Sequence, residues 1–245
     1  MSRTPATPRR GFTLRLGLTS GLVLSVLVAA ICAGGAVEAD DGSYPPVKAP
    51  APAFDPPTST TASQTAVLAG GCFWGVQGVF EHVKGVRQVL SGYAGGLKAT
   101  ADYGLVSTGA TGHAESVKII FDPRQISYGE ILRIYFFVAT DPTQLNRQFP
   151  DQGTQYRGEI FYMDDGQKAV AQRYIAQLGA ARLFKQPIVT RVEPFKGFYV
   201  AEAHHQDFLR LHPDQPYIAT FDLPKIAALK ALFPARYRAD PVRAL

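Results

Sequence analysis

Cysteine is almost absent from this chain, which contains only Cys32 and Cys72 among its 245 residues. Two thiols this far apart form no Cys-x-x-Cys pair and no zinc-finger spacing. If the N-terminal segment that carries Cys32 is removed, an intramolecular disulfide is also excluded. A lone thiol in an exported protein is usually used chemically. Cys72 is therefore the first candidate for a functional residue.

Runs of basic residues are also missing after the first 15 positions. The formal charge of +5 comes from 25 basic and 20 acidic residues, but residues 1–39 hold four of the bases and one of the acids. The remaining 21 bases and 19 acids nearly balance and form no basic patch with interleaved aromatic residues. We therefore expect no nucleic-acid partner. The sequence shows no internal repeat, and its 46% hydrophobic content suits one main domain with a sizeable core.

Residues 1–39 have the pattern of an export signal. Arginines without acidic neighbours precede residues 16–37, which are almost wholly apolar or small. The arginine pair at 9–10 resembles a twin-arginine signal, so we predict a signal peptide and a location in the periplasm or cell envelope. The apolar stretch is also long enough to span a bilayer, and a retained N-terminal membrane anchor is the alternative. The bulky Ile31 before Cys32 argues against lipidation.

The composition changes twice after this segment. Residues 40–63 are rich in Pro, Ala, Ser and Thr and contain six prolines, which predicts an extended linker. Residues 64–245 have the mixed apolar and polar patterns of a folded domain. We assign the catalytic domain to this last segment.

Hydrophobic periodicity within 64–245 predicts an α+β fold, a two-layer domain in which helices pack on a mixed β-sheet. We expect its core to be ferredoxin-like, with long ordered loops. The apolar or alternating runs predict strands at 65–69, 85–93, 113–121, 157–162 and 187–193. Helical spacing and a capping box at 127–130 predict helices at 73–83, 127–138, 164–184, 201–212 and 223–233. Segments 97–112 and 141–156 are expected to be long ordered loops, which are often functional.

The motif GGCFWG at 70–75 lies where the first predicted strand turns into the first helix. Unpaired N–H groups at a helix N-terminus favour a thiolate, so Cys72 is expected to be nucleophilic. Trp74 lies off the buried stripe of this helix and is expected to wall a pocket. A buried structural cysteine in a well-packed turn is the alternative.

Glu115 has an unusual place in the alternating strand 113–121. It shares a face with Val117 and Ile119, so its carboxyl group is expected to point toward the apolar side. Desolvation there raises the pKa of a carboxyl group and lets it hold a proton near neutral pH. The alternative is a side chain that turns to solvent or pairs with an arginine.

Four motifs together resemble the type A peptide methionine sulfoxide reductases. They are GGCFWG at 70–75, SGYAGG at 91–96, TGHAE at 111–115 and DQGTQYR at 151–157, in this order along the chain. The resemblance extends over residues 64–238. It implies a thiol-dependent oxidoreductase that reduces methionine S-sulfoxide, in proteins or free, to methionine and so repairs oxidised proteins.

The resemblance also implies roles for individual side chains. Cys72 would attack the sulfoxide sulfur and become a sulfenic acid, and Glu115 would protonate the departing oxygen. Tyr93 and Tyr156 would donate their hydroxyls to that oxygen. Asp151 would orient the polar side of the site, and Phe73 and Trp74 would hold the substrate methyl group.

This chain departs from many members of that family because it has no resolving cysteine. The tail after His212 has none, and Ser107 with Thr108 lies in the loop where other members of the family carry a resolving thiol. We expect no bound cofactor and no metal. The cysteine would be regenerated by an external thiol reductant, which is a thioredoxin-like protein, a glutaredoxin-like protein or a small thiol. The expected partners are this reductant and oxidised proteins or peptides that contain methionine sulfoxide. We expect a monomer that contacts a membrane only through an uncleaved leader.

Three other interpretations are compatible with parts of the sequence. A Cys–His acyl-transfer hydrolase would pair Cys72 with His113, His204 or His205. Adjacent histidines on a helix point about 100° apart, so His204 and His205 are poor joint metal ligands. A non-catalytic binder or redox sensor would recognise oxidised methionine without turnover. A structural envelope domain would explain the leader and linker but give the GGCFWG motif no purpose.

Overall fold

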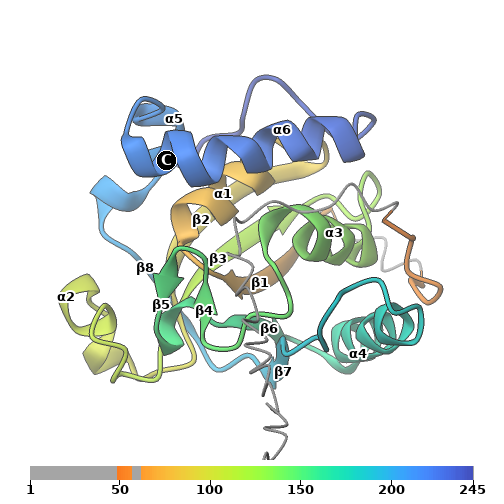
Figure 1. Ribbon diagram of the computed structural model, residues 1–245, viewed down its shortest axis with the longest axis horizontal. Coiled ribbons are helices and arrows are strands. Elements are labelled where there is room, and N and C mark those ends of the chain that lie inside the picture. Colours follow the sequence, from red (N-terminus) through yellow and green to blue (C-terminus); the bar gives the residue numbers. More distant parts are fainter. Residues whose placement is uncertain (1–48, 57–61, 245) are drawn as a thin grey trace, which may run out of the picture. The chain divides into compact units, whose positions relative to one another are not determined.

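A six-stranded mixed sheet in the order β7-β6-β1-β3-β2-β8 is the framework of the protein (Figure 1). The structure, a computed structural model, describes residues 49–56 and 62–244. The predicted signal peptide or anchor lies outside these residues, as does most of the predicted linker. The strands are β1 (Gln64–Gly70), β2 (Val86–Ala94), β3 (Ala114–Phe121), β6 (Gly158–Tyr162), β7 (Arg191–Pro194) and β8 (Phe198–Val200), and a separate two-stranded sheet joins β4 (Arg147–Gln148) to β5 (Asp151–Gln152).

The central part of the sheet has ferredoxin-like topology. The chain passes through β1, α1 (Phe73–Glu81), β2, β3, α3 (Tyr128–Ile134) and β6, and these four strands lie in the order β6-β1-β3-β2. β1 is antiparallel to both β3 and β6, and β3 is antiparallel to β2. This βαββαβ arrangement confirms the predicted α+β class and its core.

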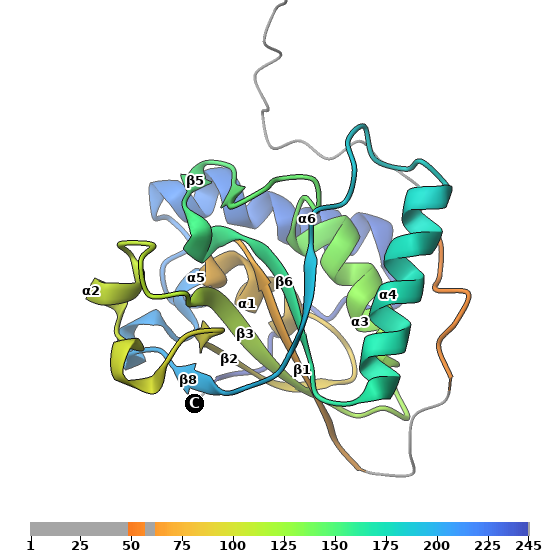
Figure 2. The ribbon, with the colours of Figure 1, turned by 90° about the horizontal axis from the view of Figure 1, so that it is seen from below.

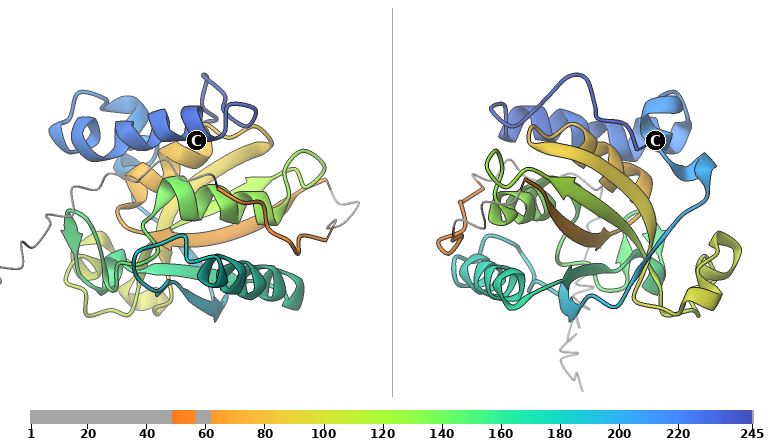
Figure 3. Two further views of the ribbon diagram at one scale, coloured as in Figure 1. Left: turned by 45° about the vertical axis from the view of Figure 1, so that its right-hand side comes forward. Right: turned by 180° about the vertical axis from the view of Figure 1, so that it is seen from behind.

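Alternation along the strands separates the two faces of the sheet. In β1, Ala66 and Leu68 enter the main core with the helices, whereas Val67 and Ala69 belong to a smaller cluster on the other face. The helices of the main core are α1, α3, α4 (Asp165–Ala180) and α6 (Leu223–Leu232), with α5 (Phe208–Leu211) and α6 in contact with α1 (Figure 3). Glu115 pairs in register with Tyr93 and shares the helix-covered face with Val117, as its spacing predicts.

The sheet must be strongly curled, because a short connection joins its two edges. β7 and β8 are the outermost of six strands, and five gaps of about 4.8 Å would separate them by about 24 Å in a flat sheet. The four steps from Pro194 to Phe198 reach only about 14 Å. Figure 2 shows this connection crossing the sheet from β7 to β8. We call residues 195–197 the edge connection.

Several predicted elements differ from the structure. The predicted strand 187–193 pairs only from Arg191, and β8 was not predicted. The predicted helix 201–212 is broken at Asp207, whose φ of 54° is left-handed, leaving η4 (Ala203–His205) and α5. The other helical segments include three short ones in the predicted loops, η1 (Lys98–Thr100), α2 (Tyr103–Val106) and η3 (Thr154–Tyr156), and two π-helical turns, η2 (Tyr135–Ala139) and η5 (Ile218–Asp222). Within residues 49–56 and 62–244 no helix has the length and apolar character that a membrane crossing requires.

Part of the predicted linker packs against the domain in extended form. Tyr174 of α4 donates its hydroxyl to the carbonyl of Pro50 over 2.7 Å, and Arg173 lies over the ring of Phe54. Asp55 accepts hydrogen bonds from the hydroxyl of Ser127 and the backbone N–H of Gly129. Residues 49–56 therefore follow the domain surface instead of hanging free.

Asp55 completes the N-terminal cap of α3, and its loss should be measurable. Ser127 caps the helix by accepting from the N–H of Glu130, as predicted, and Asp55 satisfies a second N–H of the first turn. Asp55→Ala is expected to lower the free energy of unfolding by about 1 kcal/mol in urea titrations. Asp214→Ala at an exposed position is the control. An equal loss in both variants would mean that Asp55 contributes nothing through the cap.

Candidate active site

Cys72 is the N-cap residue of α1, directly after β1. Gly71 before it has a φ of 97°, which lets the chain turn sharply from strand to helix. The cysteine is 8% exposed and is a free thiol. The motif thus presents one sulfur at the start of a helix, as the sequence predicts.

Glu115 lies beside this thiol although it is 43 positions away in the chain. Its Oε2 accepts a hydrogen bond of 3.0 Å from the backbone N–H of Phe73, the residue after Cys72. The side chain is 2% exposed, and burial raises its pKa to about 8, with a smaller raising effect from Asp151. Glu115 is therefore an acid that keeps its proton at neutral pH, next to a nucleophile.

The pKa of Cys72 shifts opposite to the direction that we expected. Burial raises it well above its usual value, and the charges of Glu115 and Asp222 add to this effect. A backbone hydrogen bond from Trp74 at the helix N-terminus lowers it, but by less. The expectation of a free thiolate is wrong for the ligand-free protein, because burial and the nearby carboxyl groups raise the pKa of the thiol more than the helix N-terminus lowers it.

Asp222 and Lys225 form a buried ion pair at the first turn of α1. The Nζ of Lys225 lies 3.1 Å from Oδ1 of Asp222, which is fully buried. A Cβ at Gly75 would lie 2.0 Å from the same oxygen, so the third glycine of the motif makes room for this pair. Neither residue was predicted, since nothing near them in the chain indicates contact with α1.

Asp222 is expected to restrain the reactivity of Cys72. Asp222→Asn removes a negative charge near the sulfur and lowers the pKa of the thiol, although burial still dominates that pKa. The rate of alkylation by iodoacetamide at pH 8 should rise several-fold, because the thiolate is the reacting form. Asp214→Asn is the exposed control. An unchanged alkylation rate in Asp222→Asn would contradict this electrostatic effect.

Two tyrosines other than Tyr93 bring hydroxyl groups to the site. Burial raises the pKa of Tyr156, and so do the nearby charges of Glu115, Asp151 and Cys72. Burial also raises the pKa of Tyr103 in α2, and the nearby charges of Glu115 and Cys72 raise it further. Both hydroxyls therefore remain hydrogen-bond donors at neutral pH. Tyr103 was missed, and the only indication of its role was its place in a long glycine-punctuated loop.

Tyr93 is placed differently from the expectation. It is fully buried, and its hydroxyl donates to Oε2 of Glu202 over 2.8 Å. Glu202 also accepts the backbone N–H of Tyr103 through Oε1 at 3.0 Å. The geometry thus gives Tyr93 a role in holding Glu202 and, through it, Tyr103. It does not support a direct hydrogen bond from Tyr93 to substrate.

Asp151 lies on the polar side of the site, as predicted. Its Oδ2 accepts a hydrogen bond from the hydroxyl of Tyr217, and burial raises its pKa. The same tyrosine lies edge-on to Trp74, with ring centroids 6.2 Å apart. Tyr217 therefore links Asp151 to the aromatic side of the site. It was missed because it lies 66 residues further along the chain.

Phe73 and Trp74 differ in exposure, which bears on their predicted contact with substrate. Phe73 is buried, with its ring centroid 5.9 Å from that of Tyr93. Trp74 is partly exposed and stacks on Phe208 with a centroid distance of 3.8 Å. Trp74 is thus the member of the pair that presents an accessible apolar surface, and Phe73 supports it from the core.

The histidines are oriented by partners other than the thiol. The ring of His113 lies against Leu97, with Nε2 3.0 Å from the carbonyl oxygen, and accepts the N–H of Gly96. Nδ1 of His205 accepts the indole N–H of Trp74, and His204 is exposed. A Cys–His hydrolase therefore gains no support. Among residues 49–56 and 62–244 no group of three or more His, Cys, Asp or Glu side chains is arranged to hold a metal ion.

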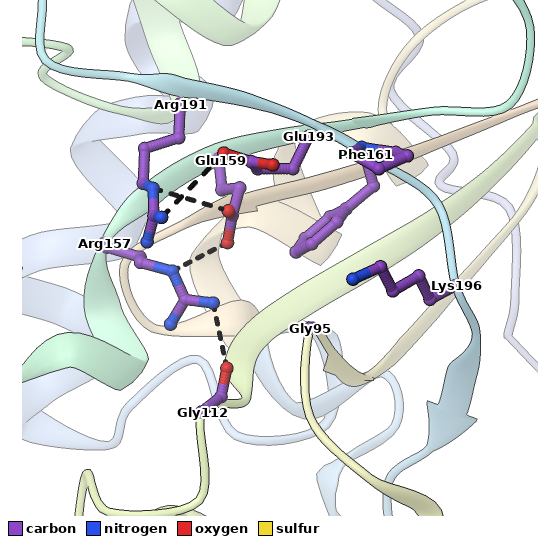
Figure 4. A pocket seen from close by; sticks show the side chains of 9 residues that line it. Gly95, Gly112, Arg157, Glu159, Phe161, Arg191, Glu193 and Lys196 are labelled. Carbon is purple, nitrogen blue, oxygen red and sulfur yellow. Dashed lines mark hydrogen bonds and ion pairs between the residues drawn. The ribbon is translucent and has the colours of Figure 1, made fainter.

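A cavity of about 210 Å³ lies on the other face of the sheet and is distinct from this site (Figure 4). Phe161 in its wall belongs to the cluster with Ala94 and Ala114, which alternate with Tyr93 and Glu115 along their strands. The cavity is lined by Gly95, Gly112, Arg157, Glu159, Phe161, Arg191, Glu193, Pro194 and Lys196.

Arg157 on this face ties together the loops that lead to the site. Its guanidinium donates to Glu159 over 2.6 Å and to the carbonyls of Gly112 and His113 over 3.0 and 3.2 Å. Figure 4 shows these contacts from Arg157 to Glu159 and Gly112. Arg157 thereby fixes the start of β3 with Glu115 relative to the turn that carries Tyr156.

Comparison with known proteins places this chain in a family. Its residues 64–235 match the family described as peptide methionine sulfoxide reductase. A peptide methionine sulfoxide reductase MsrA 2 of Mesorhizobium japonicum is 60% identical over 183 residues, which cover 75% of this chain and 94% of that protein. A second MsrA 2, of Synechocystis, is 51% identical over 75% of this chain and 87% of that protein.

Solved structures agree with the sequence comparison. Mxr1 from Saccharomyces cerevisiae in reduced form superimposes with a TM-score of 0.58 at 29% identity, over 66% of this chain and 92% of that one. Methionine sulfoxide reductase A of Corynebacterium diphtheriae gives a TM-score of 0.54 at 31% identity, over 63% of this chain and 77% of that one. The family match at residues 64–235 spans most of the described domain and includes the motif around Cys72. This chain belongs to the peptide methionine sulfoxide reductase family, type A.

Proposed function

We propose that this protein reduces methionine S-sulfoxide, in proteins or free, to methionine and thereby repairs oxidised proteins. The observation that carries the proposal is the contact between Glu115 and the N–H of Phe73, which puts a proton donor beside Cys72. A sulfoxide sulfur needs a nucleophile on one side and a proton for its oxygen on the other. Family membership supports the same reaction.

The reaction transfers one oxygen atom from substrate to enzyme. Sγ of Cys72 attacks the sulfoxide sulfur while Glu115 gives its proton to the sulfoxide oxygen. The oxygen then passes from the substrate sulfur to Sγ, which leaves methionine and a cysteine sulfenic acid. The thiol proton returns to Glu115, so atoms and electrons balance. The buried thiol loses its proton only as the attack proceeds, in keeping with its raised pKa.

The remaining site residues fit binding and orientation. The hydroxyls of Tyr156 and Tyr103 remain protonated and suit hydrogen bonds to the sulfoxide oxygen. Asp151, held by Tyr217, orients the polar side. The exposed surface of Trp74, supported by Phe73, suits the substrate methyl group through apolar contact.

Regeneration requires an external thiol. Cys72 is the free cysteine of the described residues, and the rest of the sequence offers only Cys32 in the predicted leader. A thiolate from a thioredoxin-like protein, a glutaredoxin-like protein or a small thiol would attack the sulfenic acid and release water. A second thiol then reduces the mixed disulfide. We expect the enzyme to act as a monomer, exported to the periplasm or cell envelope by its leader or anchored there.

Steady-state assays with the two sulfoxide epimers test this function. With dithiothreitol as reductant, we expect repeated turnover of the S epimer of a blocked methionine sulfoxide and at least about 10²-fold lower kcat/KM for the R epimer. Multiple turnovers exclude a stalled sensor. No turnover of either epimer, with release of product from a thioester substrate instead, would favour the hydrolase.

A further inference from the structure

Phe149 is an aromatic side chain exposed in the turn of a hairpin. It lies between β4 and β5, which pair with each other, and 37% of its surface is exposed. Its backbone N–H donates to Oε1 of Gln144 over 2.8 Å, so the turn is tied to the preceding loop. The hairpin therefore holds this ring at a defined place on the surface.

A second phenylalanine, from the C-terminal region, meets this ring. Phe221 in η5 is partly exposed, and its ring centroid lies 5.7 Å from that of Phe149 with an interplanar angle of 81°. Such an edge-to-face arrangement is a favourable one for two aromatic rings. The fold thus brings two accessible rings from distant segments into contact, and we call Phe149 and Phe221 the phenylalanine pair.

Aromatic contacts connect this pair to the substrate site. The ring of Tyr217 lies 5.1 Å from that of Phe221 and 6.2 Å from that of Trp74, measured between centroids. None of the four side chains is buried, so apolar surface is accessible at each step outward from Trp74. The three steps place the ring of Phe149 at most about 17 Å from that of Trp74.

The two segments that carry the pair also reach the site through their neighbouring residues. Asp222 follows Phe221 directly and forms the buried ion pair at the first turn of α1. Asp151 lies two residues after Phe149, and its carboxylate accepts the hydroxyl of Tyr217. The phenylalanine pair is therefore part of the same wall that surrounds the site.

The distance from the site suits a peptide and not a single amino acid. An extended chain advances about 3.3 Å per residue, so a side chain within about five positions of methionine sulfoxide reaches the pair while the substrate methyl group lies against Trp74. Free methionine sulfoxide has no group that extends so far. Aromatic side chains are enriched at interfaces, and contact with one removes a large apolar area from water.

We propose that Phe149 and Phe221 form a subsite for a large apolar side chain, aromatic ones above all, that lies near methionine sulfoxide in an oxidised peptide segment. The inference rests on the proposed reductase function and deepens it by naming a class of substrate. Continuity with the wall at Trp74 assigns the pair to the chain that carries the sulfoxide, and not to a reductant or a second copy of this protein.

Peptides that differ at one position test the subsite. Each blocked peptide carries methionine S-sulfoxide at its centre and serine at the about five positions on either side that the pair can reach, with one serine replaced by phenylalanine. With dithiothreitol as reductant, at least one such peptide should have a kcat/KM about five- to tenfold above that of the all-serine peptide, mainly through a lower KM. No gain at any position would overturn the proposal.

Variants of the pair locate the gain. Phe149→Ser is expected to remove most of it, and Phe149→Leu, which keeps an apolar side chain, to retain part of it. Met163→Ser should keep all of it, since Met163 is 39% exposed but follows the end of β6 opposite to Cys72. Every variant should reduce N-acetylmethionine S-sulfoxide at the wild-type rate, because this substrate does not reach the pair. A gain that persists unchanged in both Phe149→Ser and Phe221→Ser would overturn the proposal.

Three further results separate the other occupants and the proposed function. A defect of Phe149→Ser that appears with a thioredoxin-like reductant but not with dithiothreitol would assign the pair to the reductant. A dimer in sedimentation that Phe149→Ser abolishes would assign it to a second copy, and either result overturns the proposal. If the wild type reduces no sulfoxide at all, the proposed function fails. Binding of the same peptides, followed by the emission of Trp74 as the single tryptophan, then still decides the subsite.

Discussion

Glu115→Gln is expected to lower kcat/KM for methionine S-sulfoxide by a factor of about 10² or more, because the amide cannot give up a proton to the sulfoxide oxygen. The wild-type profile should also fall as the pH rises through about 8, where Glu115 loses its proton. This limb of the profile should be absent from the variant. The measurement is kcat/KM between pH 6 and 10 with saturating dithiothreitol.

Alkylation of Cys72 distinguishes a variant that has lost only the acid Glu115 from a variant whose whole site is damaged. Glu115 raises the pKa of the thiol, after the larger effect of burial. In Glu115→Gln the thiol should therefore react faster with iodoacetamide while turnover is slower. Glu193→Gln, at a half-exposed carboxylate, is the matched control. A variant that loses both turnover and alkylation would point to misfolding, and one that keeps full turnover would exclude Glu115 as the acid.

Cys72→Ser is expected to abolish turnover completely, because a hydroxyl at this position is neither a reductant nor a sufficient nucleophile. A second result is expected of protein that keeps Cys72, namely a change in its mass. Full-length protein with Cys32→Ala, treated with one equivalent of S-sulfoxide and no reductant, should gain one oxygen atom at Cys72. Intact-mass and peptide mass spectrometry measure both the gain and its position.

The double variant Cys32→Ala, Cys72→Ser is the control for that mass change and should gain nothing. Added thiol should remove the oxygen from the single variant and restore its original mass. Release of methionine without any oxygen on the enzyme would contradict the sulfenic acid intermediate. An oxygen on another residue would mean that this residue, and not Cys72, is the nucleophile.

Local patterns in the sequence sufficed to find the two residues at the centre of the site. Cys72 follows from a strand that turns into a helix, and Glu115 from a period of two along one strand. Both patterns are local, since the first lies within residues 65–83 and the second within residues 113–121. The same holds for the ferredoxin-like core, whose strands and helices have strong periodicity.

Contacts between distant segments explain what the sequence could not predict. Asp222 and Tyr217 belong to the C-terminal region. No local pattern in the sequence indicates that Asp222 contacts α1 or that Tyr217 contacts Asp151. The hydroxyl of Tyr93 is bound by a carboxylate 109 positions away. The pKa of Cys72 was expected to fall because the helix end is visible in the sequence, whereas burial and nearby carboxyls are properties of the fold.

The edge connection limits how this protein can change in length. It closes the curl with only three residues between β7 and β8, and β8 leads directly into the segment with Glu202 and His205. A deletion there would pull the sheet edge, and with it the partners of Tyr103 and Trp74, out of register. Natural variation in chain length is therefore expected to avoid residues 195–197 and to collect in loops that leave the two edges untouched.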